Sequence, residues 1–228
     1  MAKFNSENLD KVIKILRREV RKYRPPVVSF VADHTKNDPF LILISCLLSL
    51  RTQDKTTEKA TKKLFQLAKT PQEMLKLSLK EIEKAIYPVG FYRVKAGNIK
   101  RICATLVDKF FGKVPDDLDK LLSLPGVGRK TANLVLTEGF NKLGVCVDTH
   151  VHRISNRWGM VETKTPEQTE FALREILPRR YWKEFNYLLV TYGQNICKPI
   201  NPRCLQCKIY WFCAKRGVNK SWKFRKRR

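Results

Sequence analysis

The sequence contains few acidic residues, no apolar run of membrane-spanning length and no apolar signal region at its start. The longest apolar run, residues 40–50, is interrupted by Ser45 and Ser49. It falls short of the roughly 18–20 residues that a span needs, and it suits a helix buried in a protein core. The first eight residues lack an apolar stretch followed by a small-residue cleavage site. We therefore expect a protein with no membrane partner, located inside the cell, in the cytoplasm or nucleoid, or in the nucleus of a eukaryote.

The shortage of acids leaves a strongly basic chain. The 228 residues include 46 Lys and Arg against 21 Asp and Glu, a net charge of +25. Such a chain usually binds an anion. A hydrophobic content of 43% and a charged content of 29% are ordinary for a globular protein, so neither a disordered nor a fibrous chain is expected. The charge favours a nucleic-acid partner, although a ribosomal protein or a protein that binds acidic membranes would share it.

No long stretch alternates between apolar and polar residues, and no repeat of 20–50 residues is present, which argues against sheets and solenoids. Apolar residues recur instead at helical spacing, and the predicted fold class is all-α with short connections. The basic tail, 214–228, has eight Lys or Arg and no acid. It would be either a disordered end or an arm that contacts DNA or directs localisation. The helical patterns cover residues 9–23, 40–50, 60–67, 71–86, 93–111, 117–123, 129–140, 149–159, 166–177 and 180–196.

Two glycines separated by one residue mark the segment 116–133, which reads as a short helix, a hairpin and a second helix. Gly126 and Gly128 would let the backbone turn tightly and leave its amides exposed. Exposed amides followed by a helix N-terminus form a site for a phosphate oxygen. A helical hairpin that simply needs glycine is the alternative interpretation. The chain has no Gly-x-x-x-x-Gly-Lys-Ser/Thr motif, which argues against a nucleotide-binding loop.

Four of the seven cysteines lie within 17 residues, with the spacing C-x6-C-x2-C-x5-C and no interposed histidine or carboxylate that would be an obvious ligand. Four thiolates suit either zinc or an iron–sulfur cluster, and the spacing alone does not choose between them. The other three cysteines sit in apolar contexts and are interpreted as core residues. The four candidate metal ligands are Cys197, Cys204, Cys207 and Cys213.

Three motifs in this order carry a resemblance to a known family: Leu124-Pro-Gly-Val-Gly-Arg-Lys-Thr-Ala-Asn133, then Val147-Asp-Thr-His150, then the four-cysteine loop. Together they resemble the endonuclease III family of helix-hairpin-helix DNA glycosylases, and compatible helical patterning extends from about residue 6 to 213. The resemblance implies a two-lobed fold with the substrate entering between the lobes. One lobe is a six-helix barrel module, 34–143, and the other combines 1–33 with 144–213 and holds a 4Fe-4S cluster.

The resemblance also implies a function, namely base-excision repair of double-stranded DNA containing a damaged base or an abasic site, by a monomer. The catalytic lysine of the family falls on Lys130, which would attack C1′ of a flipped-out nucleotide and form a Schiff base. The adjacent Arg129 and the helix N-terminus disfavour a second positive charge and would favour the neutral amine. Asp148 would stabilise the positive charge that develops on the sugar, and it would also cap the helix that follows.

Two further positions would fill the space left by the flipped base. In Ser49-Leu-Arg-Thr-Gln-Asp54 the sequence has Arg51 where the family often has glutamine, so selectivity for the opposite base is open. Phe91, in Gly90-Phe-Tyr-Arg93, matches a hydrophobic wedge position, and a buried loop anchor is the alternative.

The expected activity is that of a bifunctional DNA glycosylase and AP lyase on oxidised or ring-saturated pyrimidines. Two alternatives compete with it: a mismatch glycosylase that removes thymine or uracil, and a DNA-binding module without catalysis. Lys130 counts against both, because mismatch relatives commonly lack the lysine and pure binding does not need it.

Overall fold

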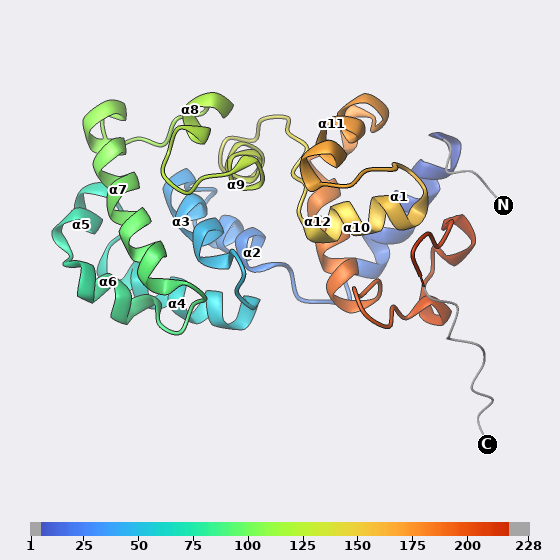
Figure 1. The fold of residues 1–228 in the computed structure, drawn as a ribbon, viewed down its shortest axis with the longest axis horizontal. Helices are drawn as coiled ribbons and strands as arrows, with labels where there is room; N and C mark the ends of the chain where they lie inside the picture. The colour runs from blue at the N-terminus through green and yellow to red at the C-terminus, as the bar shows by residue number, and fades with distance from the viewer. Residues whose placement is uncertain (1–5, 219–228) are drawn as a thin grey trace, which may run out of the picture. The chain divides into compact units, whose positions relative to one another are not determined.

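The structure of the chain, a computed structural model, describes residues 6–218. Within these residues it contains helices and no strand, which confirms the predicted all-α class (Figure 1). The chain forms two compact units. Unit 1 comprises the described residues through Arg24, Val147–Pro178 and those from Glu184 onward, and unit 2 comprises Pro25–Cys146 and Arg179–Lys183. Most of the basic tail expected at 214–228 lies outside the described residues.

Unit 2 is built around α3 (Pro39–Ser49), which is buried at every position from Phe40 to Leu48. The run that the sequence marks as a core helix therefore has neighbours on all sides, including α2, α4, α7 and α9. Asp38 starts the helix, because its carboxylate accepts hydrogen bonds from the backbone N–H groups of residues 40 and 41. The other helices are α2 (Val27–His34), α4 (Asp54–Leu67), α5 (Pro71–Lys76), α6 (Leu79–Ile86), α7 (Tyr92–Phe110), α8 (Leu118–Leu122) and α9 (Arg129–Leu134).

Several helices of unit 2 differ from the prediction, and α4 begins at Asp54 rather than at residue 60. The single helix predicted over 71–86 is two helices, because Leu77 is extended and Ser78 forms a capping box with Glu81 that starts α6. The helix predicted over 129–140 ends as α9 at Leu134 and continues as one π-helical turn, Val135–Gly139. Helix α2 was not predicted at all.

Unit 1 contains α1 (Ser6–Val20), α10 (Thr149–Trp158), α11 (Pro166–Ile176) and most of α12 (Trp182–Asn195). An ion pair between Arg17 and Glu184 joins α1 to α12, with Arg17 Nε donating to the carboxylate at 2.9 Å. The apolar face predicted for the first helix is buried, with exposed fractions of 0–3% for Leu9, Val12, Ile13, Leu16 and Val20. The sequence pattern thus identified the face of α1 that packs.

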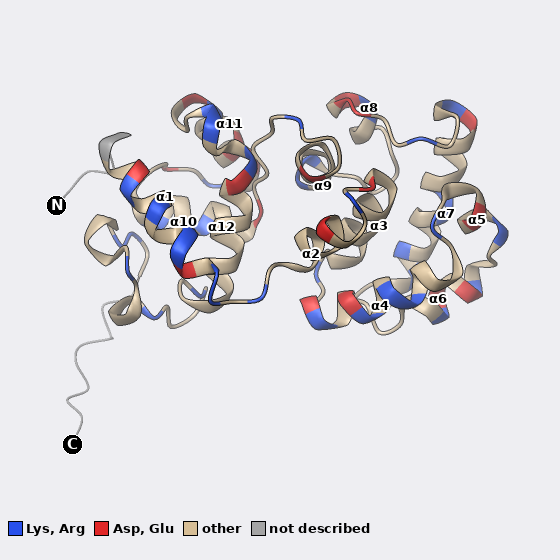
Figure 2. Cartoon of the chain, turned by 180° about the vertical axis from the view of Figure 1, so that it is seen from behind, with Lys and Arg blue, Asp and Glu red and all other residues tan. Residues whose placement is uncertain are grey.

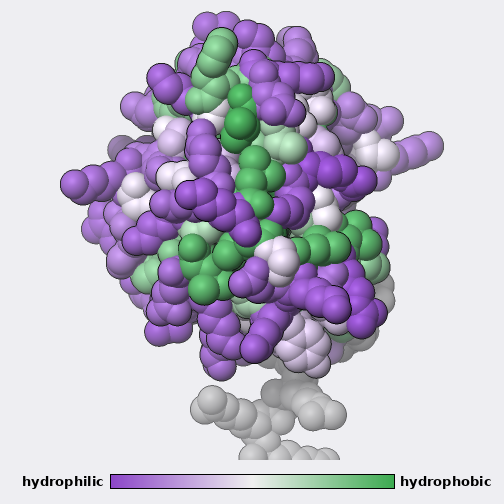
Figure 3. Space-filling model, turned by 90° about the vertical axis from the view of Figure 1, so that its left-hand side faces the viewer, coloured by the Kyte–Doolittle hydropathy of each residue, from purple (hydrophilic) through white to green (hydrophobic). Residues whose placement is uncertain are grey.

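The surface is basic but not uniformly hydrophilic. Lys and Arg lie on helices of both units (Figure 2). Exposed apolar residues at the ends of α4, α6 and α7 include Leu67, Leu79 and Phe111. The view from the α5 side of unit 2 shows apolar side chains in a strip bordered by hydrophilic ones (Figure 3). No helix in the described part of the chain is long and apolar enough to span a membrane.

Candidate DNA-binding and catalytic residues

The hairpin predicted from the glycines is present between α8 and α9. Asp117 caps α8 by accepting a hydrogen bond from the backbone N–H of Lys120 at 3.0 Å. The turn closes where the N–H of Val127 donates to the carbonyl of Leu124 at 3.1 Å, and both of these side chains are buried. The apolar residues of the motif therefore anchor the hairpin, while its glycines are exposed.

The two glycines of the hairpin have different roles. Gly126 adopts a φ of +77°, and a Cβ there would lie 2.4 Å from Nδ2 of Asn98 on α7. Gly128 has a φ of −100° and open space within 4 Å of a Cβ position. The expectation that both glycines serve the tight turn is therefore wrong for Gly128, because any residue adopts this extended conformation. Only Gly126 is required by the turn, and Gly128 faces open space at the start of α9.

This difference predicts opposite effects of two alanine substitutions. Gly126→Ala should lower the free energy of unfolding by about 1–2 kcal/mol, because alanine disfavours the left-handed conformation. Gly128→Ala should change it by less than about 0.5 kcal/mol, as expected for a surface substitution without a clash. Thermal unfolding and DNA affinity measured on both variants test this. If a phosphate oxygen approaches the amides at Gly128, Gly128→Ala alone should keep its stability and lose DNA affinity. Unchanged DNA affinity in Gly128→Ala would show that the hairpin does not hold the anion site.

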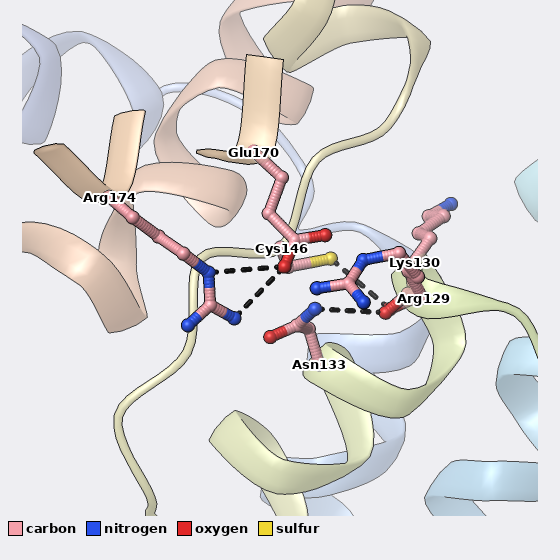
Figure 4. Close-up of polar contacts among 6 residues, drawn as sticks. All are labelled: Arg129, Lys130, Asn133, Cys146, Glu170 and Arg174. Carbon is pink, nitrogen blue, oxygen red and sulfur yellow. Dashed lines mark hydrogen bonds and ion pairs between the residues drawn. The ribbon is translucent and has the colours of Figure 1, made fainter. Parts of the chain in front are cut away.

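Lys130 lies in the first turn of α9 and is partly exposed. Its backbone carbonyl accepts a hydrogen bond from the thiol of Cys146 at 3.4 Å, and Asn133 Nδ2 donates to the carbonyl of Arg129 at 3.1 Å. The Lys130 side chain extends away from these contacts (Figure 4). Buried groups thus fix the backbone on both sides of the amine-bearing residue. Cys146, interpreted from the sequence as a core residue, is one of these groups.

Asp148 belongs to unit 1 and is the N-cap of α10. Its Oδ1 accepts hydrogen bonds from the backbone N–H groups of His150 at 2.8 Å and Val151 at 2.9 Å. Only 8% of the residue is exposed. The capping role suggested by the sequence is present, and it holds the carboxylate in one orientation.

Arg51 and Phe91, 40 positions apart in the sequence, lie side by side in unit 2. The guanidinium carbon of Arg51 is 5.6 Å from the centroid of the Phe91 ring. Both residues have positive φ, +52° and +57°, and Phe91 is 61% exposed. Left-handed backbone at a residue other than glycine costs of order 1–3 kcal/mol and is concentrated at functional positions. The exposure of Phe91 argues against the alternative of a buried loop anchor.

The loops that carry these two residues are tied together by their neighbours. The N–H of Gly90 donates to Oγ1 of Thr52 at 3.2 Å. A Cβ on Gly90 would lie 2.7 Å from the carbonyl oxygen of Arg51, so only glycine permits this approach. The buried Lys95 donates to Oγ1 of Thr52 as well, at 3.2 Å. Lys95 was not among the residues predicted from the sequence, because a lysine in a basic chain has no distinctive pattern.

The four cysteines of the predicted metal site lie in one loop of unit 1, following α12. All four are free thiols of intermediate exposure. Burial raises the pKa of the Cys204, Cys207 and Cys213 thiols, and the charge of Cys197 adds to each rise. The thiols are therefore close enough to interact electrostatically. Among residues 6–218, no group of three or more Cys, His, Asp or Glu side chains meets the geometry of a metal site.

Donors from α10 and α12 surround the cysteine loop. Tyr192 donates its hydroxyl to Sγ of Cys207 at 3.2 Å, and Arg157 Nη1 donates to Sγ of Cys197 at 3.5 Å. Arg157 is 8% exposed and also donates to the carbonyl oxygens of Lys198 and Pro199, at 2.7 and 2.8 Å. Hydrogen bonds to sulfur favour the thiolate over the thiol. The loop thus offers four thiols, and the donors on Cys197 and Cys207 suit the charged form of these two.

Comparisons with known proteins identify the family of the chain. The family model described as HhH-GPD superfamily base excision DNA repair protein matches residues 44–179. Endonuclease III of Thermotoga maritima is 50% identical over 202 residues, which cover 89% of this chain and 92% of that protein.

Two solved structures extend the comparison. The structure of a trapped endonuclease III–DNA covalent intermediate, an estranged-adenine complex, matches with a TM-score of 0.74 and 38% identity over 78% of this chain and 84% of that one. The structure of a thermostable thymine-DNA glycosylase matches with a TM-score of 0.71 and 25% identity, over 90% and 97%. From the family model and the identity to endonuclease III across nearly the whole chain, we conclude that this protein belongs to the endonuclease III family within the HhH-GPD superfamily of base excision DNA repair proteins.

Proposed function

We propose that the protein excises oxidised or ring-saturated pyrimidines from duplex DNA through Lys130 and then cleaves the strand 3′ to the abasic site. Its family makes it a base-excision DNA glycosylase with AP lyase activity. The observation that carries the proposal for the site is the position of Lys130, in the first turn of α9, two residues after the open Gly128. Because its substrate is DNA, the enzyme would work where the cell keeps its DNA.

Lys130 supplies the nucleophile. A base inside a duplex is out of reach, so the nucleotide first leaves the stack, at a cost of a few kcal/mol that is smallest for a damaged base. The neutral amine of Lys130 then attacks C1′, and the base departs with the electron pair of the glycosidic bond. Loss of a proton from nitrogen and opening of the sugar give a Schiff base. Removal of a proton from C2′ lets the 3′ phosphate leave by β-elimination, and water then releases the lysine.

Asp148 supplies negative charge to this reaction. As the base departs, positive charge develops on the sugar, and a carboxylate stabilises it. The same carboxylate is the family's partner for the lysine proton. Its two hydrogen bonds from the N-terminus of α10 keep its side chain from reorienting as the charge develops.

Three contacts would hold the distorted DNA. The exposed amides at Gly126 and Gly128 bind a phosphate oxygen, which offsets part of the cost of flipping. Phe91 stacks beside the gap, and Arg51 enters it and donates to the orphaned base. Arginine only donates, and the edge of the orphaned base that faces the gap presents the acceptor O6 on guanine and the acceptor N1 on adenine. We therefore propose that Arg51 makes excision depend on the opposite base, with faster excision opposite guanine than opposite adenine.

The cysteine loop would hold a 4Fe-4S cluster through Cys197, Cys204, Cys207 and Cys213. The donor set supports this: burial, together with the charge of neighbouring cysteines, raises the pKa of the Cys204 and Cys207 thiols, so a cationic centre would stabilise their thiolates, and Tyr192 and Arg157 already donate to sulfur. When bound, the cluster supplies a cross-link that fixes the loop. The residues of the loop then keep α10 and α12 in place.

Borohydride trapping tests the proposed activity. Borohydride reduces a Schiff base to a stable covalent bond, so we expect a protein–DNA adduct on duplexes that carry one ring-saturated or oxidised pyrimidine, and on abasic duplexes. Duplexes with a thymine or uracil mispaired with guanine, and undamaged duplexes, form the other arms. Adducts on the abasic duplex without excision of any damaged pyrimidine would contradict the proposed substrate, and excision confined to the mispaired bases would favour a mismatch glycosylase.

A further inference from the structure

Lys95 is a buried ammonium in a position that its own helix disfavours. It lies in the first turn of α7, where the helix carries partial positive charge, and only 6% of the residue is exposed. Its Nζ donates to the carbonyl oxygens of Leu48 at 3.0 Å and Leu50 at 2.5 Å, and to Oγ1 of Thr52 at 3.2 Å. Three acceptors thus compensate the buried charge.

The carbonyl acceptors belong to the C-terminal end of α3, which ends at Ser49. Carbonyl groups at a helix C-terminus lack partners within the helix and carry partial negative charge, so a cation there is favourable. Burial lowers the pKa of the Lys95 amine to about 8. The Lys95 amine is therefore desolvated, and the acceptors at the C-terminal end of α3 take the place of water.

Lys95 also connects the two loops that carry the proposed DNA contacts. Arg51 lies between Leu50 and Thr52, and both of these residues accept a hydrogen bond from the Lys95 amine. The backbone N–H of Lys95 donates to the carbonyl of Phe91 at 3.0 Å. One residue thus restrains both left-handed positions, through its side chain on one loop and its backbone on the other.

We propose that Lys95 is a positioning residue that holds Arg51 against Phe91 and thereby sets the selectivity of the enzyme for the base opposite the lesion. The inference rests on the proposed function, in which Arg51 enters the gap left by the flipped nucleotide. A left-handed arginine relaxes toward the ordinary helical or extended regions when its neighbours are released. Its guanidinium then no longer meets the orphaned base in one geometry, and discrimination between bases is lost.

Lys100 provides a matched control on the same helix. Its Nζ donates to the carbonyl oxygens of Leu75 at 2.6 Å and Leu77 at 2.7 Å, at the C-terminal end of α5. Lys100→Met therefore removes the same kind of contact as Lys95→Met. The two substitutions differ in the segment that loses a contact. Of the two lysines, Lys95 contacts the segment that carries Arg51, and Lys100 contacts the end of α5.

The test is the ratio of single-turnover excision rates, at saturating enzyme, for one ring-saturated pyrimidine placed opposite guanine and opposite adenine. An inactive or unfolded fraction scales both rates equally, so loss of stability alone does not change this ratio. Arg51→Ala should lower the ratio by about fivefold to a hundredfold, the range for loss of one base-specific contact. We expect Lys95→Met to lower it comparably, Lys100→Met to leave it unchanged, and the double variant Arg51→Ala with Lys95→Met to lower it no further than Arg51→Ala alone.

Failure of the inference differs from failure of the proposed function. An unchanged ratio of the two excision rates in Arg51→Ala would show that Arg51 does not contact the orphaned base. The basis of the inference would then be lost. A reduced ratio in Arg51→Ala together with a wild-type ratio in Lys95→Met, or an equal shift in Lys100→Met, would overturn the role of Lys95 alone. Should Lys95→Met fail to fold, Lys95→Gln keeps one donor group without the cation, and the same reduction in the ratio is expected.

Discussion

Lys130→Ala should lose base release and strand cleavage together while it still binds abasic DNA. If one amine both expels the base and forms the Schiff base, neither step survives without it. We expect the single-turnover rate to fall by on the order of 10³ or more, as when a nucleophile that acts with partner groups is removed. Binding should change by only a few-fold, because the hairpin amides remain.

Lys120→Ala is the control for loss of charge, since Lys120 is an exposed lysine on α8 of the same hairpin. It should reduce affinity slightly and leave the single-turnover rate at saturation unchanged. Gel assays that follow base release and strand cleavage separately, together with borohydride trapping, distinguish the outcomes. A Lys130→Ala protein that cleaves at the wild-type rate would exclude the lysine from the mechanism.

Purified protein should be brown and contain iron and sulfide in equal amounts, and Cys204→Ala should lose both the colour and the order of the 197–213 loop. Loss of one thiolate leaves the cluster with an incomplete ligand set. Because cluster binding contributes to folding, the variant should also unfold at a lower temperature. Absorbance, metal analysis and thermal unfolding measure these effects without an activity assay.

Cys103→Ala is the matched control for this substitution. Cys103 is buried in α7 of unit 2, outside the loop, and burial raises the pKa of its thiol to about 12. The variant should lose some stability but keep full iron content. Stoichiometric zinc in protein purified without oxygen would show that the loop holds a different metal.

The sequence was sufficient for the elements that have a strong local signal. The apolar face of α1 and the all-apolar α3 follow directly from the spacing of their residues. The hairpin follows from its glycines. The break between α5 and α6 was not predicted, because the apolar spacing continues across it, although Ser78 and Glu81 carry a capping-box signature.

The rest of the candidate site depends on contacts between distant segments. The pairing of Arg51 with Phe91 joins the end of α3 to the start of α7, and nothing in either segment predicts left-handed backbone. The close approach that excludes a side chain at Gly126 comes from Asn98, which lies on α7. Single-sequence patterns contain local periodicity and motifs, whereas these features arise from tertiary packing.

The division of the chain between the two units has a consequence for its biosynthesis. Unit 2 is nearly continuous in sequence, whereas unit 1 combines α1 with segments that begin at Val147 and Glu184. A chain leaving the ribosome N-terminus first exposes α1 long before its partner Glu184 exists. The apolar face of α1 must therefore stay unpaired, or be held by a chaperone, through most of translation. Premature termination before residue 184 would leave that face exposed and prone to aggregation, even where unit 2 had already folded.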